Sequence, residues 1–391
     1  MTTLPFASVT TEDQLNQDLM AIAGGTANYT IAIASDFTLT TDLFAVNLGT
    51  GGALTLQGSG HTIDGAHTYR GLFDYAGVLI VNNLTIADAT ARGGHGGGGS
   101  ADGGGGGGGG AGLGGGLFVA AAGNATLDNV TFTNDSAIGG DGGSNTPDSS
   151  LAGGGGGGMG GAGGDGQQRN VSGTGLEQFA GSGGGIGLLA TGGSLNPGGS
   201  GLIPTGKGQT GGGGGTGSGI NSYNSGGGGV TPKGIDGGFG GGGAGDQGGT
   251  GGPATTGGFG GFGGGGGGQG AGGFGGGGGG GFVTVIGFGA GHGGIISNNG
   301  NTFPGGGGGG LGAGGDIFIQ EGGQLTLDGL GLNAGTVAGG APGSTAGKGT
   351  LATAGSAFGN GIFLESSNST QPITFAPPSV SPPRSTASSP T

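Results

Sequence analysis

Apolar residues alternate with small or polar residues along several stretches of the chain that resemble one another. The clearest copies span residues 71–94, 116–140 and 316–340, and a weaker copy spans 361–375. A period of two is typical of half-buried β-strands, and short runs of Gly, Asn and Asp between the apolar positions favour tight turns. The pattern therefore predicts an all-β chain built from repeated coils of short strands.

Equivalent phenylalanines in the copies predict how the coils stack. The chain advances by 45 residues from Phe73 to Phe118 and again from Phe318 to Phe363. This spacing fits a coil of roughly 25 residues followed by a glycine-rich insertion of roughly 20. One coil cannot bury its own apolar face, so equivalent residues of neighbouring coils stack. We expect a right-handed parallel β-helix, or β-solenoid, with these phenylalanines as a ladder down its core.

Two asparagines mark a common turn of the coils. Asn83 and Asn129 occupy equivalent positions, and Gly329 replaces them in the third copy. Asn tolerates left-handed backbone angles, and stacked amides can bond from coil to coil. We expect a turn ladder of Asn83 and Asn129.

A helical pattern precedes the coils. Apolar residues one helical turn apart follow Thr11, which can cap the helix, and Gln14 can complete a capping box. The sequence predicts a short helix over residues 12–23, within an N-terminal cap of residues 1–25. Such a helix would cover strand edges that are otherwise unpaired at the end of the solenoid.

Glycine-rich tracts divide the predicted coils, and two interpretations of them stay open. They are nearly uncharged and poor in serine relative to glycine. They are either disordered or form polyproline-II-like glycine strands, with three residues per turn, whose bare backbones hydrogen-bond side by side. The predicted order is coils over 26–140 with a first insertion at 93–115, a long insertion over 141–315, coils over 316–375 and a Pro/Ser/Thr-rich flexible tail over 376–391.

Composition and charge exclude several classes of protein. The 391 residues include 129 glycines without the strict Gly-X-Y period, which excludes collagen. Seven basic and 21 acidic residues give a net charge of −14, which disfavours nucleic acid and anionic lipid as partners. No apolar run of about 18 residues predicts a membrane span. The absence of cysteine excludes disulfides and thiolate sites.

The segments YTIAIASDFTLTTDL, ALTLQGSGHTIDG and ATLDNVTFTND, with Gly-rich corners, resemble the passenger regions of autotransporter and polymorphic outer-membrane-type proteins. The resemblance covers residues 10–140 and 311–375. It implies a pectin-lyase-like β-helix that is secreted to the bacterial surface and acts in adhesion, aggregation or matrix formation. The chain departs from the family pattern at both ends, without a recognisable signal peptide or a barrel sequence after the tail, so the export route stays open.

Catalytic patterns are sparse. Pectin-cleaving enzymes share the predicted fold, and their hydrolases contain a Gly-His-Gly tripeptide like the one around His95. No Asp-Asp pair or Arg-x-Lys accompanies His95, and the three lysines lie in loop-like tracts. No catalytic or cofactor-binding residue is therefore assigned, and a carbohydrate-active enzyme is kept as the alternative function.

Turn aspartates raise the question of calcium. Carboxylates at turns can coordinate hard cations, but the nonapeptide of calcium-binding repeats does not recur. We expect no metal or other cofactor and interpret these residues as solvated turn aspartates, with calcium as the alternative. They are Asp64, Asp128, Asp135, Asp141 and Asp328.

The sequence favours a non-enzymatic structural protein that is extracellular or displayed on the bacterial cell surface. Its expected role is adhesion, aggregation or formation of a fibre or matrix. The expected partners are other copies of the chain in a fibre, or a glycan or protein surface of a host cell or matrix. Ice or surface binding by flat threonine-bearing or polyglycine faces is a second alternative.

Overall fold

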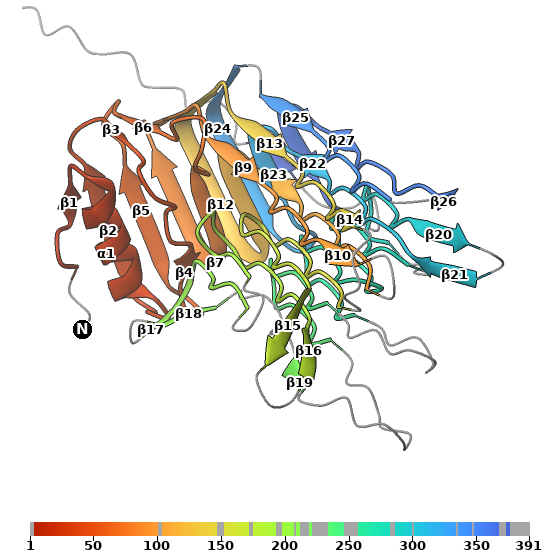
Figure 1. Cartoon of the computed structure of the whole chain (residues 1–391). Helices are drawn as coiled ribbons and strands as arrows, with labels where there is room; N and C mark the ends of the chain where they lie inside the picture. Colours follow the sequence, from red (N-terminus) through yellow and green to blue (C-terminus); the bar gives the residue numbers. More distant parts are fainter. Residues whose placement is uncertain are drawn as a thin grey trace, which may run out of the picture.

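The structure is a computed structural model of the chain (Figure 1). It describes residues 4–100, 104–146, 152–171, 175–192, 198–206, 209–211, 219–220, 234–245, 257–281, 286–298, 301–333, 335–345, 348–366 and 373–375. The predicted tail over 376–391 lies outside the described residues. The fold is all-β with one described helix, as the sequence predicts.

The predicted N-terminal helix is present as α1 (Glu12–Ile22). Gln14 N donates to the Thr11 hydroxyl at 3.4 Å, and the Gln14 side chain accepts from Thr10 N at 2.8 Å. The helix ends before Gly24, whose φ of 71° only glycine adopts readily. Its apolar face is buried, and Figure 1 shows α1 beside β2 at one end of the row of strands.

The repeated segments stack in parallel and form a curled sheet (Figure 1). Every ladder in this sheet is parallel, and equivalent positions of the sequence copies face one another. The longer strands are β2 (Asn28–Ile33), β5 (Ala53–Gln57), β7 (Leu72–Asn82), β12 (Leu117–Thr133) and β24 (Gln324–Asn333). The shorter ones are β1 (Ser8–Val9), β3 (Phe37–Thr38), β4 (Val46–Asn47), β6 (Thr62–Asp64), β8 (Thr85–Ala87), β23 (Ile317–Ile319), β28 (Ile362–Leu364) and β29 (Ile373–Phe375).

Two small parallel sheets mark where the glycine-rich segments leave and rejoin the repeats. The chain leaves after β9 (Thr90–Arg92), β13 (Ser136–Ile138) and β25 (Thr336–Ala338), which pair in register. It rejoins at β11 (Gly112–Leu113), β22 (Gly312–Ala313) and β27 (Ala357–Phe358), which also pair in register. All glycine-rich segments therefore meet the repeats at one corner.

Further short strands lie within or beside the glycine-rich region. The alternating pattern of the repeats does not predict them. They are β10 (Gly99–Ser100), β14 (Asn145–Thr146), β15 (Gln167–Val171), β16 (Gly175–Phe179), β17 (Ile203–Gly206), β18 (Gln209–Gly211), β19 (Gly219–Ile220), β20 (Ile295–Asn298), β21 (Asn301–Pro304) and β26 (Gly349–Thr350).

The glycine segments themselves form an ordered bundle. The segment 104–111 donates backbone hydrogen bonds to three neighbouring segments in turn, as in Gly107 to Gly97 at 2.9 Å and Gly110 to Gly94 at 2.8 Å. Each neighbour is contacted at every third residue, which is the period of a polyproline-II-type helix. Three other segments donate back to 104–111. The six neighbours are 94–97, 140–143, 154–157, 263–266, 277–280 and 305–308.

Bare backbones are a steric requirement of this packing. A Cβ added at Gly109 would overlap the carbonyl oxygen of Gly140, and one at Gly110 would overlap that of Gly158. We call these interlocked segments the glycine bundle. Of the two interpretations left open by the sequence, the structure supports hydrogen-bonded glycine strands for the described residues.

Candidate functional site

The four phenylalanines lie side by side, but on the opposite side of the sheet from the one expected. Phe118 pairs in register with Phe73 and Phe318, and Phe318 pairs with Phe363. The interior of the repeats is filled instead by the residue before each of them, such as Leu117. The phenylalanine rings belong to a second apolar cluster between the sheet and the glycine bundle. The ladder therefore joins two layers and does not fill the repeats.

A second row of rings comes from the glycine bundle. Each of its phenylalanines precedes a glycine with a positive φ that turns the chain from one glycine segment into the next. These Phe-Gly turns are Phe239-Gly240 (φ 71°), Phe262-Gly263 (73°), Phe274-Gly275 (71°) and Phe288-Gly289 (69°). Sequence reasoning missed them, although the recurrence of Phe before Gly within the long insertion was the signal available.

The two rows of rings interdigitate. Within the ladder, Phe118 and Phe318 stack with ring centres 5.2 Å apart, and within the bundle row Phe262 and Phe274 stack at 5.1 Å. Between the rows, most contacts are edge to face, as between Phe274 and Phe318 at 5.9 Å, whereas Phe73 and Phe239 are stacked at 6.3 Å. Offset and edge-to-face pairs are the favourable geometries for aromatic rings. The rings therefore fix the bundle to the repeats without any charged contact between the two rows.

A buried arginine lies beside this aromatic cluster. The guanidinium carbon of Arg70 is 5.8 Å from the centre of the Phe73 ring and 6.0 Å from that of Phe118, within the range of cation–π attraction. Burial lowers the pKa of Arg70 to about 10, and the nearby Asp42 carboxylate opposes that shift. Arg70 and Asp42 together place one buried cation and one partly buried anion next to the cluster.

The expected turn ladder is present. Asn129 Nδ2 donates to Asn83 Oδ1 at 2.7 Å, and the two residues have φ angles of 52° and 51°. Gly329, at the third equivalent position, has a φ of 70°. The common backbone shape of the three positions explains why only Asn and Gly occupy them.

The turn aspartates do not gather around a common point. Asp64 and Asp141 accept single backbone hydrogen bonds, from Ala66 N and Ala341 N, both at 2.7 Å. Asp128 and Asp328 face each other across a strand pair. Among the residues that the structure describes, no group of three or more His, Cys, Asp or Glu side chains could hold a metal ion.

Asp135 corrects one of the sequence-based expectations. It was expected to be a solvated turn residue, but its side chain is fully buried and Oδ1 accepts from Ala89 N at 2.8 Å. Burial raises the pKa of Asp135 to about 8, and the nearby Asp316 carboxylate adds to the rise. Asp316 is also fully buried, and burial raises its pKa to about 6. Both carboxyls therefore lie inside the repeats, away from solvent.

His95 has one acidic neighbour. Its Nδ1 lies 3.5 Å from Asp141 Oδ2, and both side chains are exposed. Within the described part of the chain, no other ion pair involves His95. The geometry at His95 is therefore a single exposed pair of a histidine and an aspartate.

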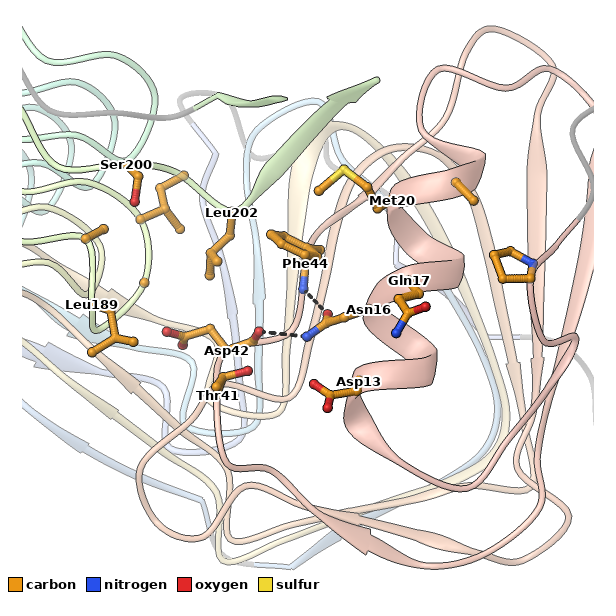
Figure 2. Close-up of a pocket in the computed structure, with 15 residues that line it drawn as sticks. Asp13, Asn16, Gln17, Met20, Thr41, Asp42, Phe44, Leu189, Ser200 and Leu202 are labelled. Carbon is orange, nitrogen blue, oxygen red and sulfur yellow. Dashed lines mark hydrogen bonds between the residues drawn. The ribbon is translucent and has the colours of Figure 1, made fainter. Parts of the chain in front are cut away.

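The structure contains an apolar cavity of about 670 Å³ between α1 and the glycine-rich region (Figure 2). Met20 lines it from the helix, and Leu189 and Leu202 line it from the insertion, with Phe44 between them. Ala45 N donates to Leu202 O at 2.9 Å, which ties the far wall to the repeats. No sequence pattern predicts this cavity, because its walls come from segments far apart in the chain.

One asparagine holds the floor of the cavity in place. Asn16 Oδ1 accepts from Phe44 N at 2.8 Å, and Asn16 Nδ2 donates to Asp42 O at 3.2 Å. Asp42 Oδ2 in turn accepts from Leu188 N at 2.8 Å. Burial raises the pKa of Asp42, and this hydrogen bond opposes the rise. The contacts connect the helix, the 41–44 loop and the insertion into one preformed surface.

The fold and these sites define a class of protein, namely stacked parallel repeats with a glycine bundle attached through aromatic rings. Comparison of the chain with models of protein families, with curated proteins and with solved structures finds no match. Among the described residues, no helix is long and apolar enough to cross a membrane.

Proposed function

We propose that this chain is a non-enzymatic structural protein of the bacterial surface or extracellular space, acting in adhesion, aggregation or fibre or matrix formation. In this proposal the stacked repeats complete a right-handed parallel β-helix of the autotransporter-passenger type. The observation that carries it is the glycine bundle, a hydrogen-bonded layer made almost entirely of backbone and attached to the repeats by interdigitated rings.

The ends of the glycine segments support a role in presenting loops. The Phe-Gly turns lie against the repeats, whereas antiparallel hairpins lie at the opposite ends of the segments. The pairs β15–β16 and β20–β21 extend away from the main sheet in Figure 1. Binding residues often stand on loops held by a rigid scaffold. These hairpins are therefore the proposed contact points for a cell, a glycan or another copy of the chain.

Binding and assembly measurements test the proposal. The purified chain is applied to cultured cells and to a glycan array, and electron microscopy records filaments. Replacing residues 168–178 by two glycines should weaken binding or assembly, while circular dichroism and the melting temperature stay unchanged. The same replacement of residues 296–303 tests the second hairpin. A folded chain that neither binds nor assembles would contradict the proposal.

A row of threonines favours ice or surface binding as a second candidate. Thr30, Thr55, Thr126 and Thr326 occupy one row across the outward face of the main sheet, with Ile80 between the second and third. Neighbouring strands repeat about every 4.8 Å, so the hydroxyl groups of adjacent threonines lie about one strand spacing apart, with one position missing at Ile80. Thermal hysteresis of the purified chain tests this candidate, with Thr126→Lys as the disrupting variant. A wild-type chain without hysteresis would rule it out.

A further inference from the structure

We propose that the cavity between α1 and the glycine-rich region binds a small cationic amphiphile, with an apolar body and an ammonium head group. The cavity is separate from the hairpins proposed to act in adhesion. Its volume of about 670 Å³ lies in the range of small-molecule sites, which are mostly apolar with a few placed polar groups.

The apolar part of the ligand is inferred from the cavity walls. Met20, Phe44 and Leu202 are only partly buried, although they face one another across the cavity. Leu189, at the edge, is 85% exposed and extends the apolar lining to the surface. An alkyl or aromatic group in the cavity would cover all four of these side chains.

The charge of the ligand is inferred from the polar lining. Asp13 and Asp42 are the charged residues of the cavity, and no Lys, Arg or His lines it. Asp42 is already engaged by Leu188 N, and Arg70 lies behind it. Ion pairs between described residues all join histidine to aspartate elsewhere, so the Asp13 carboxylate has none. Asp13 is therefore the anchor for a cationic head group.

The cavity is also preformed. Both ends of the Asn16 amide are occupied by hydrogen bonds to Phe44 N and Asp42 O, so the floor does not have to reorganise to receive a ligand. A preformed site loses little conformational entropy on binding, which favours affinity. Gln17 and Ser200 remain at the edge as further hydrogen-bonding groups for the head group.

Calorimetric titration with three probes of equal chain length tests the proposal. Octylammonium, octanol and octanoate are each added to the full chain below their micelle concentrations. Octylammonium should bind saturably at one site, about threefold to fivefold more tightly than octanol and at least tenfold more tightly than octanoate. The absence of saturable octylammonium binding, or equal affinity for all three probes, would overturn the proposal.

Matched variants locate the site. Leu189→Gln should weaken octylammonium binding about tenfold, the worth of one covered leucine, whereas Leu351→Gln should not, because Leu351 is 67% exposed and lies outside the cavity. Asp13→Asn should weaken octylammonium binding about threefold to fivefold and leave octanol binding unchanged. Equal effects of the two leucine variants, or an equal loss of both probes in Asp13→Asn, would overturn the assignment. Unchanged melting temperatures of the free variants show that folding is intact.

Discussion

Phe118 and Phe262 meet edge to face, with ring centres 6.2 Å apart and ring planes at 68°. Phe118 belongs to a strand of the repeats, and Phe262 belongs to a turn of the glycine bundle. The contact therefore joins the two layers of the molecule directly. Its strength decides how firmly the bundle is held.

Truncating Phe118 is expected to be strongly destabilising. Phe118→Ala should lower the free energy of unfolding by about 3–5 kcal/mol, because the ring is fully buried. A double-mutant cycle with Phe262→Ala should give a coupling of about 0.5–1.5 kcal/mol. Phe259→Ala, at a side chain that is 44% exposed, should change stability by less than about 0.5 kcal/mol. Denaturant unfolding of the three single variants and the double variant measures these values, and additive effects of Phe118→Ala and Phe262→Ala would show that the two rings do not cooperate.

A single methyl group inside the glycine bundle should also be costly. Gly109→Ala would force a Cβ onto the Gly140 carbonyl oxygen, so we expect a loss of about 1–3 kcal/mol or more. Gly361→Ala is the matched control, since its Cβ would have only ordinary contacts, the nearest at 3.6 Å from Leu332. Thermal unfolding of the two variants checks the difference. Equal melting temperatures would mean that the bundle is not close-packed in solution.

Two substitutions at Asn129, in the turn ladder, separate the effect of backbone strain on stability from that of the hydrogen bond. Asn129→Gly should lose only the amide bond to Asn83, at a cost of about 1 kcal/mol. Asn129→Ala should lose that bond and also hold alanine at a φ near 52°, which adds about 1–2 kcal/mol. Denaturant titration measures the free energy of unfolding of both variants, and the glycine variant should be the more stable of the two. A glycine variant less stable than the alanine variant would contradict it.

Stability should fall as the pH rises. Burial raises the pKa of Asp135 and of Asp74 to about 8, well above the usual carboxyl value. The folded chain therefore binds these protons more tightly than the unfolded chain, and the resulting stabilisation is complete below about pH 4 and is lost between about pH 4 and 8. The melting temperature should accordingly be higher at pH 5 than at pH 9. Asp135→Asn should reduce this dependence and leave the part that Asp74 contributes, whereas Asp64→Asn should leave the whole dependence in place.

The sequence predicted the helix, the strand repeats and their register, because each depends on a local period. It misplaced the phenylalanine ladder because alternation assigns residues to two faces without saying which face lies inside. The run Leu117, Phe118, Val119 holds the missed signal. Consecutive large apolar residues indicate a strand buried on both faces, which requires a second layer outside the sheet.

The cavity and the order of the glycine segments could not be predicted in the same way. Neighbours in the bundle are chosen by backbone hydrogen bonds between distant glycines, such as Gly108 and Gly266, which carry no side-chain signal. The cavity joins Met20 to Leu202 across a similar distance in the chain. The burial of Asp135 depends on residues stacked above and below it, which a single turn sequence does not reveal.

The Phe-Gly turn also sets how this molecule can change in length. From Phe262 to Phe274 the chain runs out along the bundle and back again. This segment adds one phenylalanine ring to the row in the bundle. Duplication of such a segment in the gene would extend the bundle and the aromatic row by the same step, leaving earlier contacts in place.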